Sequence, residues 1–376
     1  MLTKNVSSKK NVENPNAKAH RIVWLSSLEL PEWDKFVRNH PQGTVYHLSN
    51  WKRAVEMSFS HIQGEVVALR DSETGVLIGG VPVYTVRSWL LGKRLVCAPF
   101  ATRCDPLLSV GSVDAAPGEP GSVISALLLR LNAIKADRLE VRTCRPDALS
   151  SINWTAQEGF KHHYIELRPD LDELLNTFSR SNVRKRIRKS EREGVRIRRG
   201  TTQTDFLSVC RHLFSTRKRL GLPPFPERFL LSLYQCFDPV DFCFFVAERG
   251  EENIGGLVAF QLGRRFMLEH LGYDFSCQHL GVSQALYWAA IRYAATAGCK
   301  TVSLGRTNAQ HEGLMTYKEH WGAKEEDLVY LRYSCGNNRR GFLLKTNGTS
   351  FFRQFIRVCP EKLCRVISHL FFRHWS

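Results

Sequence analysis

The sequence predicts an α/β protein made of two copies of one mixed-sheet unit. A hairpin pattern, VVALRDSETGVLIGGVPVYTV, recurs in the second half as FFVAERGEENIGGLVAFQL. Ile78-Gly79-Gly80 and Ile254-Gly255-Gly256 occupy matching places after the polar turns. After each hairpin the expected elements follow in the same order: strand, helix, strand, helix, strand. Such self-similarity indicates a duplication with drift in loop length. A chance match between two hairpins is the alternative.

Local signals place the elements of the first half. Pro31 opens a short helix that runs to Asn39, and Ser49 is the candidate N-cap of a helix that runs to Phe59. A further helix is expected to end before Gly159-Phe160. The remaining elements are a helix at Ser122–Ala136 and strands at Arg21–Ser26, Val66–Arg70, Val76–Val86, Lys93–Phe100, Arg138–Thr143 and Tyr164–Leu167.

The second half begins with one or two basic helices over Leu171–Glu193. A helix is expected to end at Trp321-Gly322. The other expected elements are the hairpin at Phe244–Leu262, strands at Arg265–Tyr273, Thr301–Leu304 and Leu328–Tyr333, and a helix at Val282–Ala297. These predictions divide the chain into a disordered tail (residues 1–20), two domains (21–168 and 169–335) and a C-terminal part (336–376).

The C-terminal part predicts a basic amphipathic helix after a linker at Gly336–Thr349. Apolar residues fall at i, i+3, i+4, i+7 and i+8, with Lys362, Arg365 and Arg373 near the flanks. The apolar set is Leu363, Val366, Ile367, Leu370 and Phe371. This helix either packs onto its own domain or binds the inner face of a membrane.

Amino-acid composition indicates the cellular location of the protein and the state of its cysteines. With 376 residues, 43% of them apolar, it can bury two cores. No window reaches the roughly 18 apolar residues of a membrane span, and the N-terminus lacks a signal-peptide core. We therefore expect a cytoplasmic protein, either free or peripheral on the inner membrane. The eleven cysteines include no C-x-x-C pair and no zinc-ligand spacing, so we expect reduced thiols and no metal.

Charge points to an anionic partner. The formal net charge is +17 and the pI is near 9.6. The segment from Asn182 to Arg199 carries nine cations against Glu191 and Glu193. Such a run is either a solvated helix face or a phosphate contact. No aromatic residue interleaves it, so base stacking is poorly supported.

Two segments of the second half are typical of a ligand site. Between Gly298 and Gly322 a short strand ends at Gly305-Arg306 and leads into a loop rich in hydrogen-bonding groups, Asn308 among them. Gln278, Gly281, Val282 and Ser283 stand where a strand hands over to a helix. Backbone N–H groups and a glycine at a helix start can hold a pyrophosphate, although ordinary capping explains the same residues.

These segments resemble the GNAT acyltransferase fold, whose acyl-CoA pyrophosphate loop reads R/Q-x-x-G-x-G/A. Gln278, Gly281 and Ser283 match it, with Ser in the last place. NVRKRIRKSEREGVRI, YWAAIRYAATAGCKTVSLGRT and TYKEHWGAKEEDLVYLRY look like the FemAB-like branch, which carries two GNAT-type domains in one chain. The resemblance implies tandem GNAT-like domains with mixed sheets flanked by helices.

The resemblance also implies site residues. Lys318 matches the lysine of Tyr-Lys-x-x-Trp-Gly, which lies at the active centre of aminoacyl-transferring relatives. Glu269 is the expected general base, and Tyr317 the group that returns a proton to the leaving group. Ser303 departs from relatives that have an acidic residue near this point of the strand. The expected substrate contacts are Arg306, Asn308, Trp321, Arg184 and Lys185.

The implied activity is transfer of an acyl or aminoacyl group to an amino or hydroxyl group of a cell-envelope polysaccharide or peptidoglycan precursor. The donor is acyl-CoA, such as acetyl-CoA, or aminoacyl-tRNA. The chain has no stretch long enough for the helical hairpin of bridge-forming enzymes, which favours acyl-CoA. The partners expected are a phosphorylated or lipid-linked precursor, tRNA if the donor is aminoacyl-tRNA, and a membrane surface. The alternative is a non-catalytic duplicated scaffold that binds nucleic acid or membrane through its basic segments.

Overall fold

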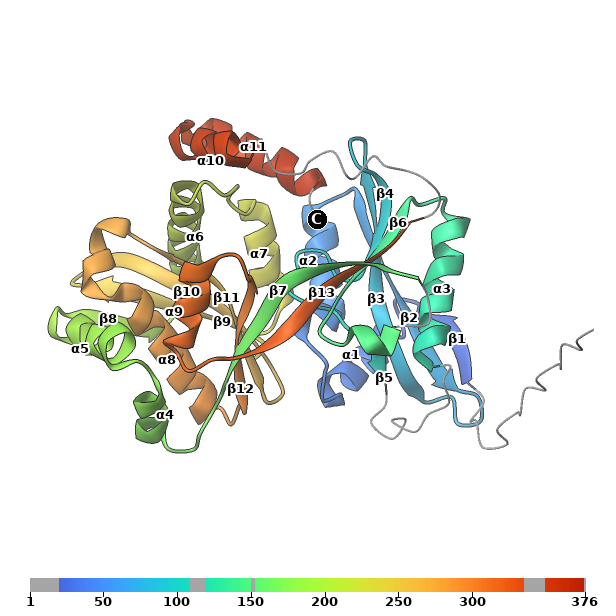
Figure 1. Ribbon diagram of the computed structural model, residues 1–376, viewed down its shortest axis with the longest axis horizontal. Coiled ribbons are helices and arrows are strands. Elements are labelled where there is room, and N and C mark those ends of the chain that lie inside the picture. Colours follow the sequence, from blue (N-terminus) through green and yellow to red (C-terminus); the bar gives the residue numbers. More distant parts are fainter. Residues whose placement is uncertain (1–19, 109–118, 150–152, 335–348, 375–376) are drawn as a thin grey trace, which may run out of the picture.

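A computed structural model describes residues 20–108, 119–149, 153–334 and 349–374 (Figure 1). Residues 1–19 of the predicted N-terminal tail and residues 336–348 of the predicted linker lie outside the described residues. We call the elements up to Glu166 the first half and those from Leu171 the second half.

The first half confirms the predicted hairpin and its flanking strands. Its strands are β1 (His20–Trp24), β2 (Ile62–Asp71), β3 (Leu77–Ser88), β4 (Gly92–Val96), β5 (Leu107–Leu108), β6 (Arg138–Thr143) and β7 (Thr155–Glu166). Its helices are α1 (Leu30–Asn39), α2 (Ser49–Ser58) and α3 (Glu119–Ala133), with short 3-10 turns η1 (Val45–His47) and η2 (Pro146–Leu149).

One predicted element of the first half is wrong. The residues before Gly159 were expected to form a helix, but β7 already begins at Thr155. Pairing with a distant strand overrides the local preference, because β7 pairs with β13 from Thr155 to Tyr164. Phe160 of β7 stacks on Tyr330 of β13 with ring centroids 4.7 Å apart.

The second half repeats the predicted order. Its strands are β8 (Val195–Arg199), β9 (Phe242–Arg249), β10 (Glu252–Leu262), β11 (Arg265–Tyr273), β12 (Thr301–Asn308) and β13 (Lys324–Ser334). Its helices are α4 (Leu171–Thr177), α5 (Lys185–Arg192), α6 (Gln203–Arg219), α7 (Glu227–Cys236), α8 (Val282–Thr296), α9 (Glu312–Glu319), α10 (Thr349–Val358) and α11 (Glu361–His374). A capping box of Thr202 and Asp205 explains where α6 begins. Two short turns, η3 (Arg180–Arg184) and η4 (Phe275–Leu280), precede α5 and α8.

The two halves exchange their last strands. The sheet runs in the order β1-β2-β3-β4-β6-β13-β7-β12-β11-β10-β9-β8. β13 of the second half therefore pairs with β6 of the first, and β7 of the first half pairs with β12 of the second. In Figure 1 these two long strands cross the middle of the molecule side by side. Neither half completes its own sheet.

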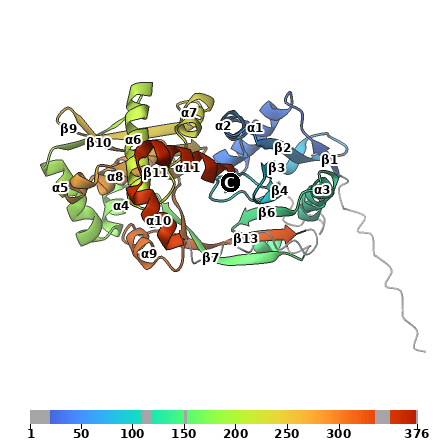
Figure 2. The same ribbon diagram turned by 90° about the horizontal axis from the view of Figure 1, so that it is seen from above.

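The core also joins the halves. One hydrophobic cluster contains residues of α1, α2, β2 and β3 together with residues of α6, α7, β9 and β10. Trp51 of α2 illustrates the junction, because its ring meets those of Phe229 and Phe260, each with centroids 6.0 Å away. A second cluster fills the other face of the second half, beneath α8, α4 and α5. Figure 2 shows α8 and α6 on opposite faces of the strands between them.

The C-terminal segment forms two helices, α10 and α11, separated at Pro360, where one amphipathic helix was predicted. The buried side of α11 consists of Cys364, Ser368 and Phe372, a different face from the one predicted. The hydroxyl of Ser88 lies 2.8 Å from Nδ1 of His374, so α11 is anchored to the first half.

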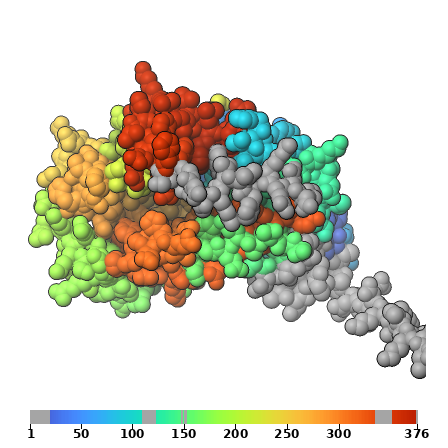
Figure 3. Space-filling model, turned by 45° about the horizontal axis from the view of Figure 1, so that its top comes forward, coloured from blue at the N-terminus to red at the C-terminus, as the bar shows by residue number. Residues whose placement is uncertain are grey.

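The predicted apolar set of α11 is divided between burial and exposure. Leu363, Val366 and Leu370 are exposed, whereas Ile367 and Phe371 pack against the core clusters. The two helices lie together on one face of the molecule (Figure 3). No helix among the described residues is both long and apolar enough to cross a bilayer.

We expect the described chain to unfold as one unit, because the strand exchange and the shared core leave neither half complete. Calorimetry should show a single transition that coincides with loss of far-UV and near-UV circular dichroism. Trp51→Ala should lower the free energy of unfolding by ~3–5 kcal/mol and shift that whole transition. Two separable transitions, with only one shifted by the substitution, would contradict this account.

Candidate active site

The site begins where β11 and β12 diverge. The two parallel strands pair only over Arg265–Met267 and Thr301–Ser303. Beyond these residues β11 continues to Tyr273 and β12 to Asn308 with no pairing between them. β12 stays paired with β7, and its register shifts between Ser303 and Gly305, where Gly305 has a φ of 69°. The divergence opens the sheet in its middle, away from either edge.

Glu269 lies on β11 just past the last paired residue. The hydroxyl of Tyr46, from η1 of the first half, donates a hydrogen bond to its carboxylate. Burial raises the pKa of Glu269 to about 7, although the Tyr46 hydrogen bond acts in the opposite direction. A carboxyl group with this pKa can accept a proton near neutral pH, as the sequence prediction of a general base requires.

Three arginines form a group that reaches Tyr46, because Arg306 interacts electrostatically with Arg142, Arg217 and the Tyr46 side chain. Among the described residues, no carboxylate lies within ion-pair distance of Arg142, Arg217 or Arg306. A guanidinium N–H of Arg142 donates to the Ala101 carbonyl at 2.7 Å, and Nε of Arg217 donates to the Pro223 carbonyl at 2.8 Å. Their positive charge is therefore available to an anionic ligand.

Arg306 was predicted from the sequence, and the structure adds the other two arginines. Its guanidinium lies over the rings of Phe160 and Tyr330, 5.5 Å from each centroid. Partial burial, and then repulsion from Arg142, lower the pKa of Arg306 to about 10, so it remains charged at neutral pH. Asn308, also predicted, is exposed, and its side-chain oxygen accepts a hydrogen bond from Gln310 N at 2.9 Å in the turn after β12.

Lys318 lies on α9 and reaches back to the diverging strand. Its side chain is only 4% exposed, and Nζ donates to the Gly305 carbonyl at 2.9 Å. Burial lowers the pKa of Lys318 to about 7. Neighbouring Tyr317 has a buried hydroxyl without a hydrogen-bond partner among the described residues, and burial raises its pKa to about 12. The two residues thus stand close to the opening in the sheet.

The burial of Trp321 does not agree with its prediction as a substrate contact. It is 0% exposed and packs between the rings of Phe178 and Tyr287, with centroids 5.2 and 5.5 Å away. The Tyr-Lys-x-x-Trp-Gly motif contains both candidate site residues and residues of the core that supports them. In this structure Trp321 belongs to the core.

The loop predicted to hold a pyrophosphate leads into α8. Gly281 caps the helix with a φ of 80°, and a Cβ on it would come within 2.6 Å of the Arg186 carbonyl of α5. Gln278 is exposed, whereas the Val282 side chain is fully buried, so only its backbone could meet a ligand. The hydroxyl of Ser283 donates to the Gln284 side chain at 3.0 Å.

The basic segment lies beside this loop. α5 packs on α8 and on η4, as Figure 1 also shows for α5 and α8. Lys185 is exposed, and a guanidinium N–H of Arg184 donates to the Asn176 side chain at 2.7 Å. The predicted phosphate contacts of α5 therefore adjoin the predicted cofactor loop, on the side of the sheet opposite the first half.

Sequence reasoning missed Tyr46, Arg142 and Arg217. None belongs to a motif, and two of them come from the first half, so only the packing of the halves brings Tyr46 to Glu269 and the arginines to one another. It also missed His162, whose ring contacts Ser303 of β12 at 2.8 Å.

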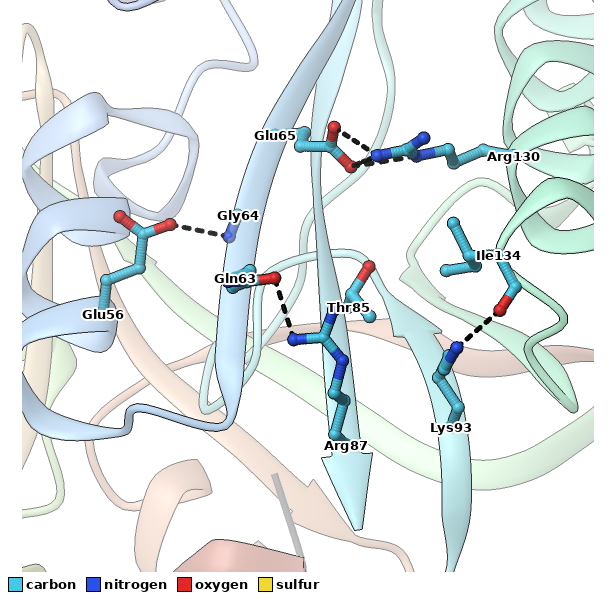
Figure 4. Close-up of a pocket in the computed structure, with 9 residues that line it drawn as sticks. All are labelled: Glu56, Gln63, Gly64, Glu65, Thr85, Arg87, Lys93, Arg130 and Ile134. Carbon is cyan, nitrogen blue, oxygen red and sulfur yellow. Dashed lines mark hydrogen bonds and ion pairs between the residues drawn. The ribbon is translucent and has the colours of Figure 1, made fainter.

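A separate pocket lies in the first half, between β2, β3, β4 and α3, and has a volume of about 330 Å³ (Figure 4). Its polar groups are paired with one another: Glu65 with Arg130, Gln63 with Arg87, and Lys93 with the Ile134 carbonyl. Because these pairings engage its charged side chains Glu65, Arg87, Lys93 and Arg130, we assign the pocket no role.

Comparison with known proteins agrees with the geometry. Residues 178–319 match the family model of the acetyltransferase (GNAT) domain. The crystal structure of FemX superposes with a TM-score of 0.68 at 14% identity, over 86% of this chain and 99% of that chain. No curated protein sequence matches the chain.

Two further solved structures have the same architecture. The C-terminal domain of a protein assigned as a lysylphosphatidylglycerol synthetase, from Agrobacterium fabrum, has a TM-score of 0.55 at 11% identity and covers 83% of this chain and 94% of its own. A tandem GNAT protein from the clavulanic acid biosynthesis pathway has a TM-score of 0.53 at 9% identity and covers 85% and 100%. These likenesses show the tandem GNAT fold that the sequence predicts.

Gly281→Ala tests the loop before α8. A non-glycine residue at this φ costs ~1–3 kcal/mol, and the clash with the Arg186 carbonyl adds to it. The variant should melt at lower temperature and bind immobilised CoA more weakly than wild type. Gly250→Ala is the matched control, because Gly250 also has a positive φ but no atom would meet its Cβ. Equal CoA binding by the two variants would argue against a role for the loop.

Proposed function

We propose that this chain, a FemAB-like member of the GNAT acyltransferase superfamily, transfers an acyl group from acyl-CoA to an amino or hydroxyl group of an anionic cell-envelope precursor. The observation that carries the proposal is the Glu269 carboxyl group. It is held by Tyr46 at the opening between β11 and β12, and three arginines that form no ion pair among the described residues reach the Tyr46 side chain.

The residues at the start of α8 fit the donor. The first N–H groups of a helix have no partners within the helix, and the helix dipole favours an anion there. Gly281 keeps the main chain open at this point, and the exposed cations of α5 lie next to it. When bound, acyl-CoA supplies a thioester carbonyl as the acyl source. The α8 N–H groups would hold its pyrophosphate.

Glu269 would act on the acceptor from the other side of the opening. Its carboxylate accepts a proton from the attacking amine or hydroxyl group, and Tyr46 orients it. The hydroxyl of Tyr317, which has no other partner among the described residues, would return a proton to the leaving thiolate. The Lys318 ammonium near Gly305 would stabilise negative charge that develops at the carbonyl. Direct attack of this kind needs no covalent enzyme intermediate.

The acceptor is proposed to be anionic because Arg142, Arg217 and Arg306 lie near one another and near Tyr46, and form no ion pair among the described residues. Guanidinium groups without acidic partners match phosphate or carboxylate groups. The resemblance to the FemAB-like branch supports a peptidoglycan or polysaccharide precursor, and the A. fabrum structure supports a lipid-linked one. Aminoacyl-tRNA remains the second donor class, supported by the cations of α5 beside the loop.

A membrane surface would bring a lipid-linked acceptor to the site. Leu363, Val366 and Leu370 form an exposed apolar row on α11. Lys362 and Arg373 lie on the same helix and would favour anionic headgroups.

The proposal is tested by the pH dependence of acyl transfer. As Glu269 ionises, kcat/KM should rise with pH up to about 7. It should fall above about pH 7 as Lys318 loses its proton, which gives a bell-shaped profile. Glu269→Gln should lower kcat about 10²–10⁴-fold and remove the ascending limb. Transfer of labelled acetyl from acetyl-CoA to peptidoglycan and lipid-linked precursors gives the rates.

Glu252→Gln is the control for that series, because Glu252 is an exposed carboxylate on neighbouring β10. If Glu269→Gln kept the ascending limb, Glu269 would not be the base. If the protein neither bound acyl-CoA nor transferred an acyl or aminoacyl group to any acceptor of these classes, the enzymatic proposal would fail.

Arg306→Gln tests the anionic acceptor. Loss of a bidentate contact with phosphate should raise the acceptor KM roughly 10- to 100-fold with a smaller change in kcat. The wild-type KM should rise with ionic strength, and that dependence should be weaker in the variant. Arg228→Gln, which changes an exposed arginine of α7, is the control. An unchanged KM in Arg306→Gln would remove this arginine from the acceptor site.

A further inference from the structure

Ser303, His162 and Glu326 form a hydrogen-bonded chain across the exchanged strands. Oγ of Ser303 lies 2.8 Å from Nε2 of His162, and Nδ1 of His162 lies 2.7 Å from Oε1 of Glu326. Arg103 holds the same carboxylate oxygen at 2.7 Å. Ser303 is on β12, His162 on β7 and Glu326 on β13, so the chain exists only because β7 lies between the other two strands.

The partners fix the direction of the hydrogen bonds. A carboxylate only accepts, so Nδ1 of His162 carries the proton and Nε2 accepts from the Ser303 hydroxyl. Burial lowers the pKa of His162, which keeps the ring neutral at pH 7. Burial opposes the ionisation of Glu326, but the His162 hydrogen bond and the Arg103 charge outweigh it and lower its pKa. The backbone N–H of Gly305 donates to Oγ of Ser303 at 3.1 Å. This is the arrangement that activates a serine hydroxyl.

The serine faces a cavity between the halves. Its volume is about 220 Å³, enough for a short acyl ester, and both halves line it. Besides the serine, the wall includes Tyr46, Thr102 and Arg265. Nε of Arg265 is buried and has no hydrogen-bond partner among the described residues, while another nitrogen of this guanidinium donates to the His40 carbonyl at 3.1 Å. The Arg265 guanidinium brings a positive charge to this wall, which would stabilise a carbonyl oxygen that becomes negatively charged.

A metal site is the competing explanation for the same residues. Cys144, His162 and Glu326 each offer an atom within 4.8 Å of the others. A thiolate would be needed for metal binding, but burial raises the pKa of Cys144 to about 12. Both ring nitrogens of His162 have hydrogen-bond partners, and Arg103 forms an ion pair with the Glu326 carboxylate. These contacts favour the serine chain.

We propose that Ser303 is a nucleophile and that this cavity hydrolyses small acyl esters or thioesters, separately from the transfer reaction based on Glu269. Oγ attacks the carbonyl carbon while its proton passes to Nε2 of His162. The C–O or C–S bond breaks, and the leaving alkoxide or thiolate takes that proton. Water then attacks the acyl-serine, giving its proton to His162. As the ester bond breaks, Oγ regains the proton and a carboxylic acid leaves.

Covalent labelling of the full chain with a fluorophosphonate probe tests the proposal, since Oγ attack at phosphorus expels fluoride and leaves a stable adduct. Peptide mass spectrometry should find one adduct per chain, on Ser303. Ser303→Ala should lose it, and His162→Gln should slow labelling about 10²–10⁴-fold. Ser215→Ala, which changes an exposed serine of α6, should label like wild type.

A second readout uses p-nitrophenyl acetate and needs no acyl-CoA, so it can succeed or fail independently of the transfer activity. Wild type should release a burst of about one p-nitrophenol per chain, followed by slower turnover, and Ser303→Ala should show neither. Circular dichroism checks that each variant is folded. The proposal is overturned if folded wild type carries no adduct on Ser303. It is also overturned if the chain binds one Zn²⁺ that Cys144→Ala abolishes and that blocks labelling.

Discussion

The exchange of β7 and β13 is the constraint on which the rest of the structure depends. Each half supplies the strand that completes the sheet of the other, so the backbone hydrogen bonds of both sheets are satisfied only in the assembled chain. The exchange places His162 between Ser303 and Glu326 and leaves β12 paired on one side only beyond Ser303. It also holds the first half against β11, where Tyr46 meets Glu269. The site is therefore a consequence of topology as much as of any motif.

Divergence of β11 and β12 then separates two chemical environments. On one side lie the start of α8, the cations of α5 and the buried hydroxyl of Tyr317. On the other lies Glu269, which meets Tyr46 of the first half, and Arg306 and Arg142 lie near the same tyrosine. Lys318 of α9 donates a hydrogen bond to the Gly305 carbonyl of β12 beside the opening. A donor and an acceptor that approach from opposite sides can meet there without competing for the same polar groups, which suits a transfer reaction.

The parts that could be predicted from sequence rest on local chemistry. Hairpin turns, the glycine at the start of α8 and the Tyr-Lys pair on α9 depend on residues close in the chain, and the structure has each of these elements where the pattern predicts. The helix predicted before Gly159 was wrong because pairing with β13 decides the conformation of that segment. For α11 the predicted helical spacing of apolar residues was right, but the predicted buried face was wrong. The surface against which the helix packs decides which side is buried. Tyr46, Arg142 and Arg217 had no signal because their roles arise from contacts across the halves.

The distribution of charge distinguishes a binding site from a merely basic protein. Several other arginines pair with acids: Arg70 with Glu32, Arg130 with Glu65 and Arg198 with Asp205. Arg142, Arg217 and Arg306 lie near one another and near Tyr46, yet form no ion pair among the described residues. Leaving cations half-buried and unpaired costs folding free energy, and proteins retain such costs mainly where a ligand removes them. The position of the cations that lack acidic partners is therefore more informative about ligand binding than the size of the net charge, +17.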